Sequence, residues 1–391
     1  MCPVDRPIYL DNHATTPVDP RVLEAMLPTF TVMFGNAASR QHAHGWEAEE
    51  LVTIAREQVA ALIGAETEEI VFTSGATESN NLAIRGVAIA HALRGRHIIT
   101  AATEHPAVLD PCERLKREGW DVTVLPVDGE GMIDLGALER AITPETTLIS
   151  LMAANSEIGI LHPLREIGAL ARERGVLFHT DAAQAAGKIA LDVNADHIDL
   201  LSISAHKMCG PKGVGALYVR RRNPRVRLEP LLEGGGHENG VRSGTLNVPG
   251  IVGLGKAAAI AREEMREEAQ TLAALRDRLL ERIRAGLSGV EVNGALERRL
   301  PGNLNLSFEG VDGDSLITAM PGLAVSTGSA CVSAKQEPSH VLRALGIGDE
   351  RVRSSLRFGI GRFNTLEEID LAAEMVIEAV TRLREMSPRL E

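Results

Sequence analysis

Residues 70–79 read IVFTSGATES, and this stretch decides the fold. A run of four apolar or β-branched residues, 70–73, predicts a buried strand. The small residues Ser74 and Gly75 then turn the backbone, and a helical pattern begins. Backbone N–H groups at such a helix start, with the Thr77 hydroxyl beside them, are suited to binding a phosphate. The signal is weak by itself, because Ser74 is also suited to capping the helix.

The same alternation of short apolar runs and helical patterns continues as far as residue 219. Strands that are apolar throughout and separated by helices are typical of a mainly parallel sheet covered on both faces. We therefore predict an α/β fold with its ligand site at the carboxyl ends of the strands. The further predicted strands are residues 97–101, 122–127, 147–152, 176–180, 200–204 and 215–219, and helices are predicted at 135–142 and 164–174.

The rest of the chain predicts a second, smaller α+β domain. Residues 251–287 are rich in Ala, Glu, Arg and Leu, which indicates one long amphipathic helix leaving the large domain. Beyond it we predict strands at 303–308 and 355–360 and a helix at 366–384. The predicted division is a large domain of residues 15–260 and a small domain of residues 1–14 and 261–391.

The composition is that of an ordinary globular protein with few aromatic residues. The chain has 391 residues and a formal net charge of -12, which argues against direct nucleic-acid binding and against attraction to an anionic membrane. No apolar run is long enough to span a bilayer. Five arginines form a local basic patch, which we expect to be a solvated loop after a strand: Arg220, Arg221, Arg222, Arg225 and Arg227.

The four cysteines are scattered and show no paired zinc-ligand spacing. This usage, with no basic and apolar leader at the amino terminus, favours a cytoplasmic location. We expect Cys2, Cys112 and Cys209 to be small buried side chains. Cys331 differs, because it lies in the small, polar stretch 326–334, STGSACVSA, which favours an accessible and reactive thiol.

Two polar residues follow buried strands and carry chemistry. Asp181 ends the apolar run 176–180, and a carboxylate there needs a cationic partner, such as a protonated pyridine nitrogen. A helix cap is the alternative interpretation of Asp181. Lys207 lies just past the run 200–204, where its amine can bind a cofactor aldehyde covalently. A phosphate loop, a strand-end Asp and a strand-end Lys, in that order, are together the anchors that pyridoxal phosphate needs.

Taken with these motifs, the chain resembles a cysteine desulfurase of the NifS/IscS type, in the class V aminotransferase group with pyridoxal-phosphate fold type I. The resemblance runs from YLDNHATTP at 9–17 to RFGIGR at 357–362. The sequence GSAC at 328–331, followed by EPSHVLR at 337–343, resembles the long-loop subgroup.

The resemblance implies roles for individual residues. Lys207 would hold the cofactor, Cys331 would act as the nucleophile, and His105 would stack on the cofactor ring and shuttle protons. Asp181 would pair with the ring nitrogen, and Gln184 would bind the phenolic oxygen, with Ser156 standing where the family usually has Asn. Arg357 would bind the substrate carboxylate, with Asn36 nearby. The phosphate would be bound by Ala76, Thr77, Ser204 and His206, and by Thr245 from the partner subunit of a homodimer.

The implied reaction converts L-cysteine to L-alanine and places the sulfur on Cys331 as a persulfide. The sulfur acceptor would be an iron–sulfur scaffold protein or another thiolation partner. The sequence leaves open which acceptor is used, because the chain ends at Glu391, sooner than IscS-like members. No resident metal is expected, and a transient role of Cys331 as a cluster ligand stays open. The alternatives are a selenocysteine lyase, a small-amino-acid aminotransferase, or a catalytically silent sulfur-transfer scaffold.

Overall fold

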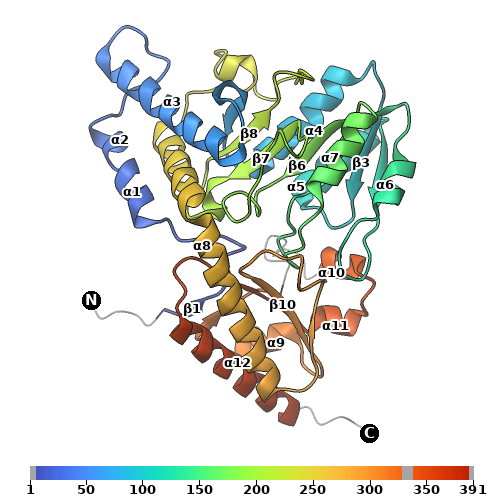
Figure 1. Cartoon of the computed structure of the whole chain (residues 1–391). Helices are drawn as coiled ribbons and strands as arrows, with labels where there is room; N and C mark the ends of the chain where they lie inside the picture. The colour runs from blue at the N-terminus through green and yellow to red at the C-terminus, as the bar shows by residue number, and fades with distance from the viewer. Residues whose placement is uncertain (1–5, 328–337, 387–391) are drawn as a thin grey trace.

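The computed structural model describes residues 6–327 and 338–386. In this part of the chain, a large sheet with helices on both faces lies above a smaller α+β unit, and one long helix joins the two (Figure 1). The predicted α/β architecture is confirmed.

The large sheet has seven strands within the described residues, in the order β2-β8-β7-β6-β5-β3-β4. Strand β8 is antiparallel to both of its neighbours, and the other pairs are parallel. Each predicted strand is present, with ends that shift by at most two residues. The strands are β2 (Ile70–Thr73), β3 (His97–Ala101), β4 (Asp121–Leu125), β5 (Thr146–Ser150), β6 (Leu177–Asp181), β7 (Leu200–Ser204) and β8 (Gly215–Val219).

Alternate side chains of these strands pack in two separate hydrophobic cores, one on each face of the sheet, because side chains along a strand point to opposite faces. Val71 and Ile98 pack on the face covered by α4 (Ala76–His91) and α5 (Pro106–Arg117). Their neighbours in sequence, such as Phe72 and Ile99, pack on the opposite face. That face is covered by α3 (Ala43–Ile63), α6 (Leu135–Ala141), α7 (Leu164–Glu173) and the first part of α8 (Val248–Gly286). Six of the seven strands are buried along their whole length, which explains their mainly apolar sequences, and the exception is the edge strand β4, where Asp121 and Val124 are exposed.

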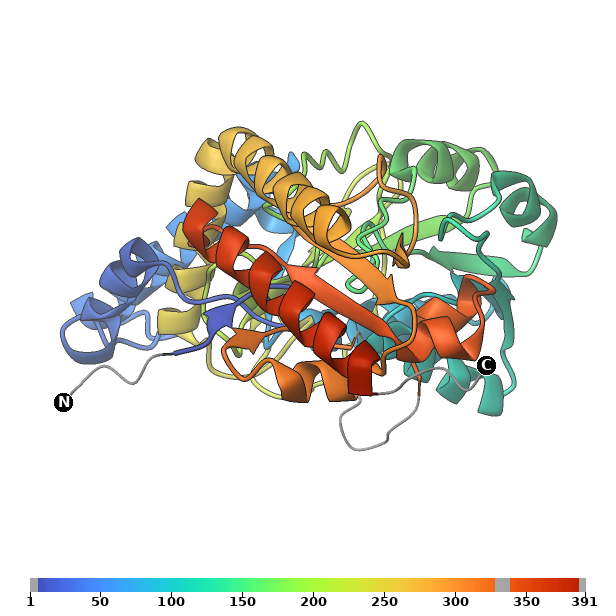
Figure 2. The same cartoon turned by 90° about the horizontal axis from the view of Figure 1, so that it is seen from below.

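The smaller unit contains a second sheet in the order β12-β10-β9, with antiparallel pairing. The amino-terminal strand β1 (Ile8–Tyr9) joins this unit by pairing in parallel with β11 (Leu323–Ala324). Helix α8 contributes Leu254 to the core of the large sheet and Leu279 to the core of the small unit. Helices α8 and α12 pack side by side across the small unit, as Figure 2 shows. The division of the chain at residues 14 and 260 stays a prediction.

The remaining elements are short, apart from helix α12. They are α1 (Pro20–Met26), α2 (Pro28–Thr31), η1 (Thr67–Glu69), η2 (Ala205–Lys207), η3 (Glu238–Gly240), β9 (Val290–Val292), β10 (Asn303–Phe308), α9 (Gly313–Ala319), α10 (His340–Ala344), α11 (Asp349–Arg353), β12 (Ser355–Gly359) and α12 (Leu366–Met386).

The prediction of a solvated basic loop after β8 is wrong for the first arginine of the patch, Arg220. Arg220 is buried, and its guanidinium lies 3.1 Å from the Asp199 carboxylate and donates to the Val193 and Ile198 carbonyl oxygens. A buried carboxylate 21 residues away in sequence provided no local signal. The other four arginines of the patch are exposed, as expected.

Candidate active site

A pocket of about 640 Å³ opens at the carboxyl ends of the large sheet, next to the small unit. It brings together most of the predicted site residues. The predicted residues that line it are Ala76, Thr77, His105, Ser156, Asp181, Gln184, Ser204, His206, Lys207 and Arg357. Asn36 and Thr245 do not line this pocket and are exposed on the surface of the chain. Cys331 lies outside the described residues.

The start of α4 is suited to binding an anion. Its N-cap is Gly75, at a φ of 152° that favours glycine, and no side chain caps the helix. The Ser74 cap considered from the sequence is therefore wrong, and the Ser74 N–H donates to Glu78 instead. The first-turn N–H groups of this 16-residue helix, beside Thr77 and Ser204, are left for a ligand such as a phosphate.

Asp181 ends β6 as a buried carboxylate. Its Oδ2 accepts a hydrogen bond from Asn80 Nδ2 at 2.6 Å, and its Oδ1 accepts one from the Ala183 N–H at 2.9 Å. No salt bridge joins it to a basic side chain within the described residues. A buried carboxylate that accepts only neutral donors fits a cationic ring nitrogen.

Lys207 lies at the end of η2, directly after β7. Its Nζ donates to the carbonyl oxygens of His13 at 2.5 Å and Ala14 at 2.8 Å. These acceptors hold the amine on the amino-terminal segment and inside the pocket. Together with the start of α4 and Asp181, Lys207 supplies the donor and acceptor set that pyridoxal phosphate requires.

His105 is the N-cap of α5, and its Nδ1 accepts a hydrogen bond from the Ala107 N–H at 3.0 Å. The neutral ring therefore carries its hydrogen on Nε2. His206 lies on another wall, with Nδ1 3.1 Å from Thr15 Oγ1. Burial, followed by the charges of Lys207, Lys212 and Lys188, lowers the pKa of His206 to about 4, so this ring is neutral near pH 7.

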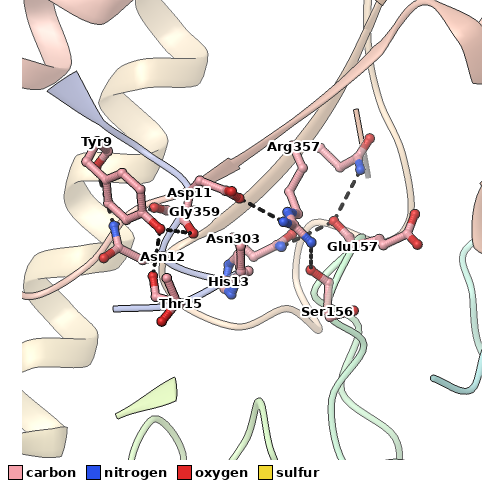
Figure 3. Close-up of polar contacts among 12 residues, drawn as sticks. Tyr9, Asp11, Asn12, His13, Thr15, Ser156, Glu157, Asn303, Arg357 and Gly359 are labelled. Atoms are coloured by element: carbon pink, nitrogen blue, oxygen red, sulfur yellow. Dashed lines mark hydrogen bonds and ion pairs between the residues drawn. The ribbon is translucent and has the colours of Figure 1, made fainter. Parts of the chain in front are cut away.

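Arg357 is buried on β12 and faces the pocket from the small unit. Its Nη2 lies 2.7 Å from Asp11 Oδ1, and its Nη1 donates to the Ser156 carbonyl oxygen at 3.1 Å (Figure 3). Its Nε has no hydrogen-bond partner among the described residues. The two Nη contacts hold the guanidinium in place in the pocket wall, where its planar donors suit a carboxylate.

Sequence reasoning missed the part played by residues 11–16. This segment contacts residues predicted to bind the substrate, to react with the cofactor aldehyde and to bind the rest of the cofactor. Asp11 binds Arg357, His13 contacts Gln184 and Lys207, and Thr15 contacts His206. The motif was visible at 9–17, but nothing in its spacing indicates which distant side chains it meets. Only the fold brings it to the pocket.

Two buried carboxyl groups of the pocket wall were also missed. Glu104 is fully buried, and burial raises its pKa well above the usual value, although the Met152 N–H donates to its Oε1 at 2.7 Å. Burial also raises the pKa of Glu157, whose Oε2 accepts a hydrogen bond from the Ser339 hydroxyl at 2.5 Å. Ser339 caps α10, so Glu157 attaches the start of that helix to the pocket wall. Neither Glu carries a local sequence signal.

Comparisons with known proteins show the family of this chain. The Aminotransferase class-V family model matches residues 8–371. A cysteine desulfurase IscS of Anaeromyxobacter dehalogenans (strain 2CP-C) is 58% identical over 385 residues, which is 98% of this chain and 95% of the relative. A cysteine desulfurase IscS of Rickettsia africae (strain ESF-5) is 56% identical, with 98% of this chain and 94% of the relative covered.

Solved structures of similar fold extend over nearly the same length. A NifS-like protein superimposes with a TM-score of 0.90 at 38% identity, covering 96% of this chain and all of that one. A structure of SspA in complex with cysteine superimposes with a TM-score of 0.81 at 38% identity, covering 91% of this chain and 99% of that one. Across the described ranges, no helix is long and apolar enough to cross a membrane.

Proposed function

Because this chain belongs to the aminotransferase class-V family, we propose that it is a pyridoxal-phosphate-dependent cysteine desulfurase. The observation that carries the proposal is the meeting of an uncapped helix start, a buried carboxylate without a basic partner, and Lys207 in one pocket. The relatives that are 56–58% identical over 98% of the chain are cysteine desulfurases, which supports the same reaction here.

In this proposal the residues of the large sheet hold the cofactor. Ala76, Thr77, Ser204 and His206 would bind its phosphate, and Asp181 would pair with its ring nitrogen. Gln184 and Ser156 would face its phenolic oxygen, and Lys207 would bind its aldehyde. When bound, pyridoxal phosphate supplies an electron sink for the bonds around the α-carbon of an amino acid.

The substrate side of the pocket combines Arg357 of the small unit with Lys207 and His105 of the large sheet. Arg357 would bind the carboxylate of L-cysteine through its unused N–H groups. Lys207 would move a proton at its Nζ to and from the substrate α-carbon. His105 is placed to exchange a proton at Nε2, because its Nδ1 is occupied by the Ala107 N–H.

Cys331 would accept the sulfur. Its thiolate attacks the sulfur of L-cysteine, a sulfur–sulfur bond forms, and the carbon–sulfur bond of the substrate breaks. The electron pair of the broken bond and a proton stay with the carbon skeleton, which leaves as alanine. A persulfide remains on Cys331 for an acceptor, which we propose is an iron–sulfur scaffold protein or another thiolation partner.

We also propose that the protein is a cytoplasmic homodimer. Thr245 and Asn36 are exposed and lie away from the pocket of their own chain, which fits a role in the site of a partner subunit. Several large apolar side chains before and in α3 are also exposed, and a second copy would bury them. These side chains are Leu27, Phe30, Val32, Phe34 and Trp46, which are 56–68% exposed.

The test is to mix the purified protein with L-cysteine and a reductant, and to measure alanine, sulfide and the visible spectrum together. Equal amounts of alanine and sulfide, with a cofactor band that shifts on adding cysteine, are expected. A band without sulfide would refute the reaction and direct attention to selenocysteine lyase or aminotransferase activity. The absence of a band would leave only a catalytically silent scaffold.

A further inference from the structure

Lys188 is a second lysine beneath the cofactor site, and the reaction described above gives it no role. It lines a small cavity of about 30 Å³ that Lys207 also lines. Its Nζ donates a hydrogen bond to Gln184 Oε1 at 3.0 Å. Among the described residues no carboxylate forms a salt bridge with Lys188, and Glu268 of the same cavity pairs with Arg362 instead. Burying an amine without a counter-charge is costly, so packing alone does not explain a lysine at this position.

The local backbone brings Lys188 and Gln184 together. The segment after β6 turns with hydrogen bonds of helical spacing, such as the one from the Ile189 N–H to the Ala185 carbonyl oxygen at 3.1 Å. Gly187 continues the turn at a φ of 74°, where glycine is favoured. Residues four positions apart lie on the same side of such a turn, so the amine of Lys188 meets the amide of Gln184.

The contacts of Gln184 fix which way its amide faces. The His13 carbonyl oxygen only accepts, so the group 2.9 Å from it is the Nε2 donor of Gln184. Gln184 Oε1 then faces Lys188 Nζ and, at 3.2 Å, the Nδ1 of the His13 ring. The second Nε2 hydrogen has no acceptor among the described residues, and Gln184 lines the main pocket. Without Lys188, the Oε1 would keep one donor, the His13 ring at the longer distance.

Lys188 can hold the amide on both sides of neutral pH. Burial, and then the positive charge of Lys207, lowers the pKa of Lys188 to about 7. An amine retains hydrogens to donate after it loses its charge, so deprotonation does not remove the donor to Gln184. The titratable and charged side chains around Lys188 come from the amino-terminal segment, from η2 and the residues after it, from α8, and from β12 and the residues after it: His13, Lys207, Cys209, Glu268, Arg357 and Arg362.

We propose that Lys188 is a positioning residue that holds the Gln184 amide with its second Nε2 hydrogen toward the phenolic oxygen of the cofactor. This inference rests on the proposed function, in which Gln184 faces that oxygen, and it adds the residue that acts through Gln184. An N–H donor favours the ionised form of the oxygen. Lys188 therefore contributes to the pH at which the nitrogen that joins Lys207 to the cofactor takes up a proton.

The test is a pH titration of the cofactor-loaded protein, because the visible band changes wavelength when this nitrogen takes up a proton. Loss of an N–H donor makes the ionised oxygen less favourable, so the nitrogen keeps its proton to higher pH. We expect Gln184→Ala to raise the midpoint of the titration by about one pH unit, the effect of one hydrogen bond to a charged group. Lys188→Met, which removes the amine and keeps a similar volume, is expected to raise the midpoint by at least half as much.

A double-mutant cycle separates action through Gln184 from a direct effect of the Lys188 charge. If Lys188 acts through Gln184, Lys188→Met will move the midpoint much less in the Gln184→Ala background than in the wild type. Lys188→Arg retains donor hydrogens and is expected to return the midpoint toward the wild-type value. Lys116→Met is the control, because it changes an exposed lysine of α5 outside the pocket, and it should leave the midpoint unchanged.

An unmoved midpoint in Lys188→Met, or equal shifts in the two backgrounds, would overturn the inference, because Lys188 would then serve packing or act by its charge alone. If Lys188→Met does not fold, Lys188→Leu gives the same comparison. Either outcome leaves the proposed function intact as long as the wild-type protein shows a cofactor band and releases sulfide from cysteine. A wild-type protein without a cofactor band would refute the proposed function and the inference together.

Discussion

The carboxylate of Asp11 and the guanidinium of Arg357 form an ion pair of 2.7 Å between the amino-terminal segment and the last strand of the small sheet. The two side chains are 17% and 4% exposed. Arg357 therefore has a resident counter-charge before any substrate carboxylate arrives. Asp11 compensates the buried charge and orients the guanidinium.

Replacing Asp11 by Asn leaves this guanidinium buried without its counter-charge. We expect Asp11→Asn to lower the free energy of unfolding by about 2 kcal/mol, less than for a fully buried pair because Asp11 is partly exposed. Urea denaturation measures the change. Glu374→Gln, which breaks the more exposed ion pair with Arg282, is expected to cost less than about 0.5 kcal/mol. Equal losses in the two variants would contradict this account.

Replacing Arg357 by Lys keeps the positive charge and removes the planar arrangement of donors. A lysine cannot bind Asp11, the Ser156 carbonyl oxygen and a carboxylate in the same geometry. We expect Arg357→Lys to raise the KM for L-cysteine by about tenfold or more, with a smaller change in kcat, in steady-state assays of sulfide release. An unchanged KM would show that another residue binds the carboxylate.

Only one cysteine is expected to carry the sulfur. Cys331→Ala should abolish sulfide release while the cofactor band and its shift with cysteine remain. Cys112→Ala is the control, because burial, and then the neighbouring Glu104, raises the pKa of the Cys112 thiol to about 12. A protonated, buried thiol is a poor nucleophile. Loss of activity in both variants would count against a unique role of Cys331.

Glu104 should make stability depend on pH. Its folded-state pKa lies above the unfolded value, so the folded state binds more protons between the two, and stability falls as pH rises through this window. Glu104→Gln keeps the acceptor for the Met152 N–H and cannot ionise. We therefore expect the variant to gain stability relative to wild type as pH rises from about 4.5 to 8. If the difference in stability between the variant and the wild type stays constant with pH, the pKa of Glu104 is the same in the folded and unfolded states.

The exposed apolar side chains before α3 should form a subunit interface. A carboxylate at Phe34, which is 63% exposed in the single chain, would be buried against the partner in a dimer. We expect Phe34→Asp to shift the protein from dimer to monomer in analytical ultracentrifugation, and to weaken cofactor retention if Thr245 serves the partner's site. Val124→Asp changes an exposed apolar residue of β4 and is the control. A dimeric Phe34→Asp protein would place the interface elsewhere.

The fold was predictable because the strands of the large sheet, apart from the edge strand β4, are buried along their whole length and are bounded by clear turns. Asp181 and Lys207 were predictable for the same reason, since each directly follows such a strand. The contacts of Glu104, Asp11 and His13 could not be predicted, because they join residues that lie far apart in the sequence. His13 meets Gln184 across 171 positions, and no periodicity or spacing reports such a pairing. The prediction that Arg220 is solvated was wrong for the same reason, since its buried partner Asp199 lies on another segment.

The amino-terminal segment also determines when the pocket can exist. Asp11 leaves the ribosome well before its partner Arg357, which follows 346 positions later. Contacts of such high sequence separation form late. The emerging chain can complete the parallel sheet before Arg357 is made, so its lysine and its arginine both meet their partners on residues 11–14 only after Arg357 has left the ribosome. The complete pocket is therefore formed only by a chain that includes Arg357, and a shorter nascent chain lacks the residue proposed to bind the substrate carboxylate.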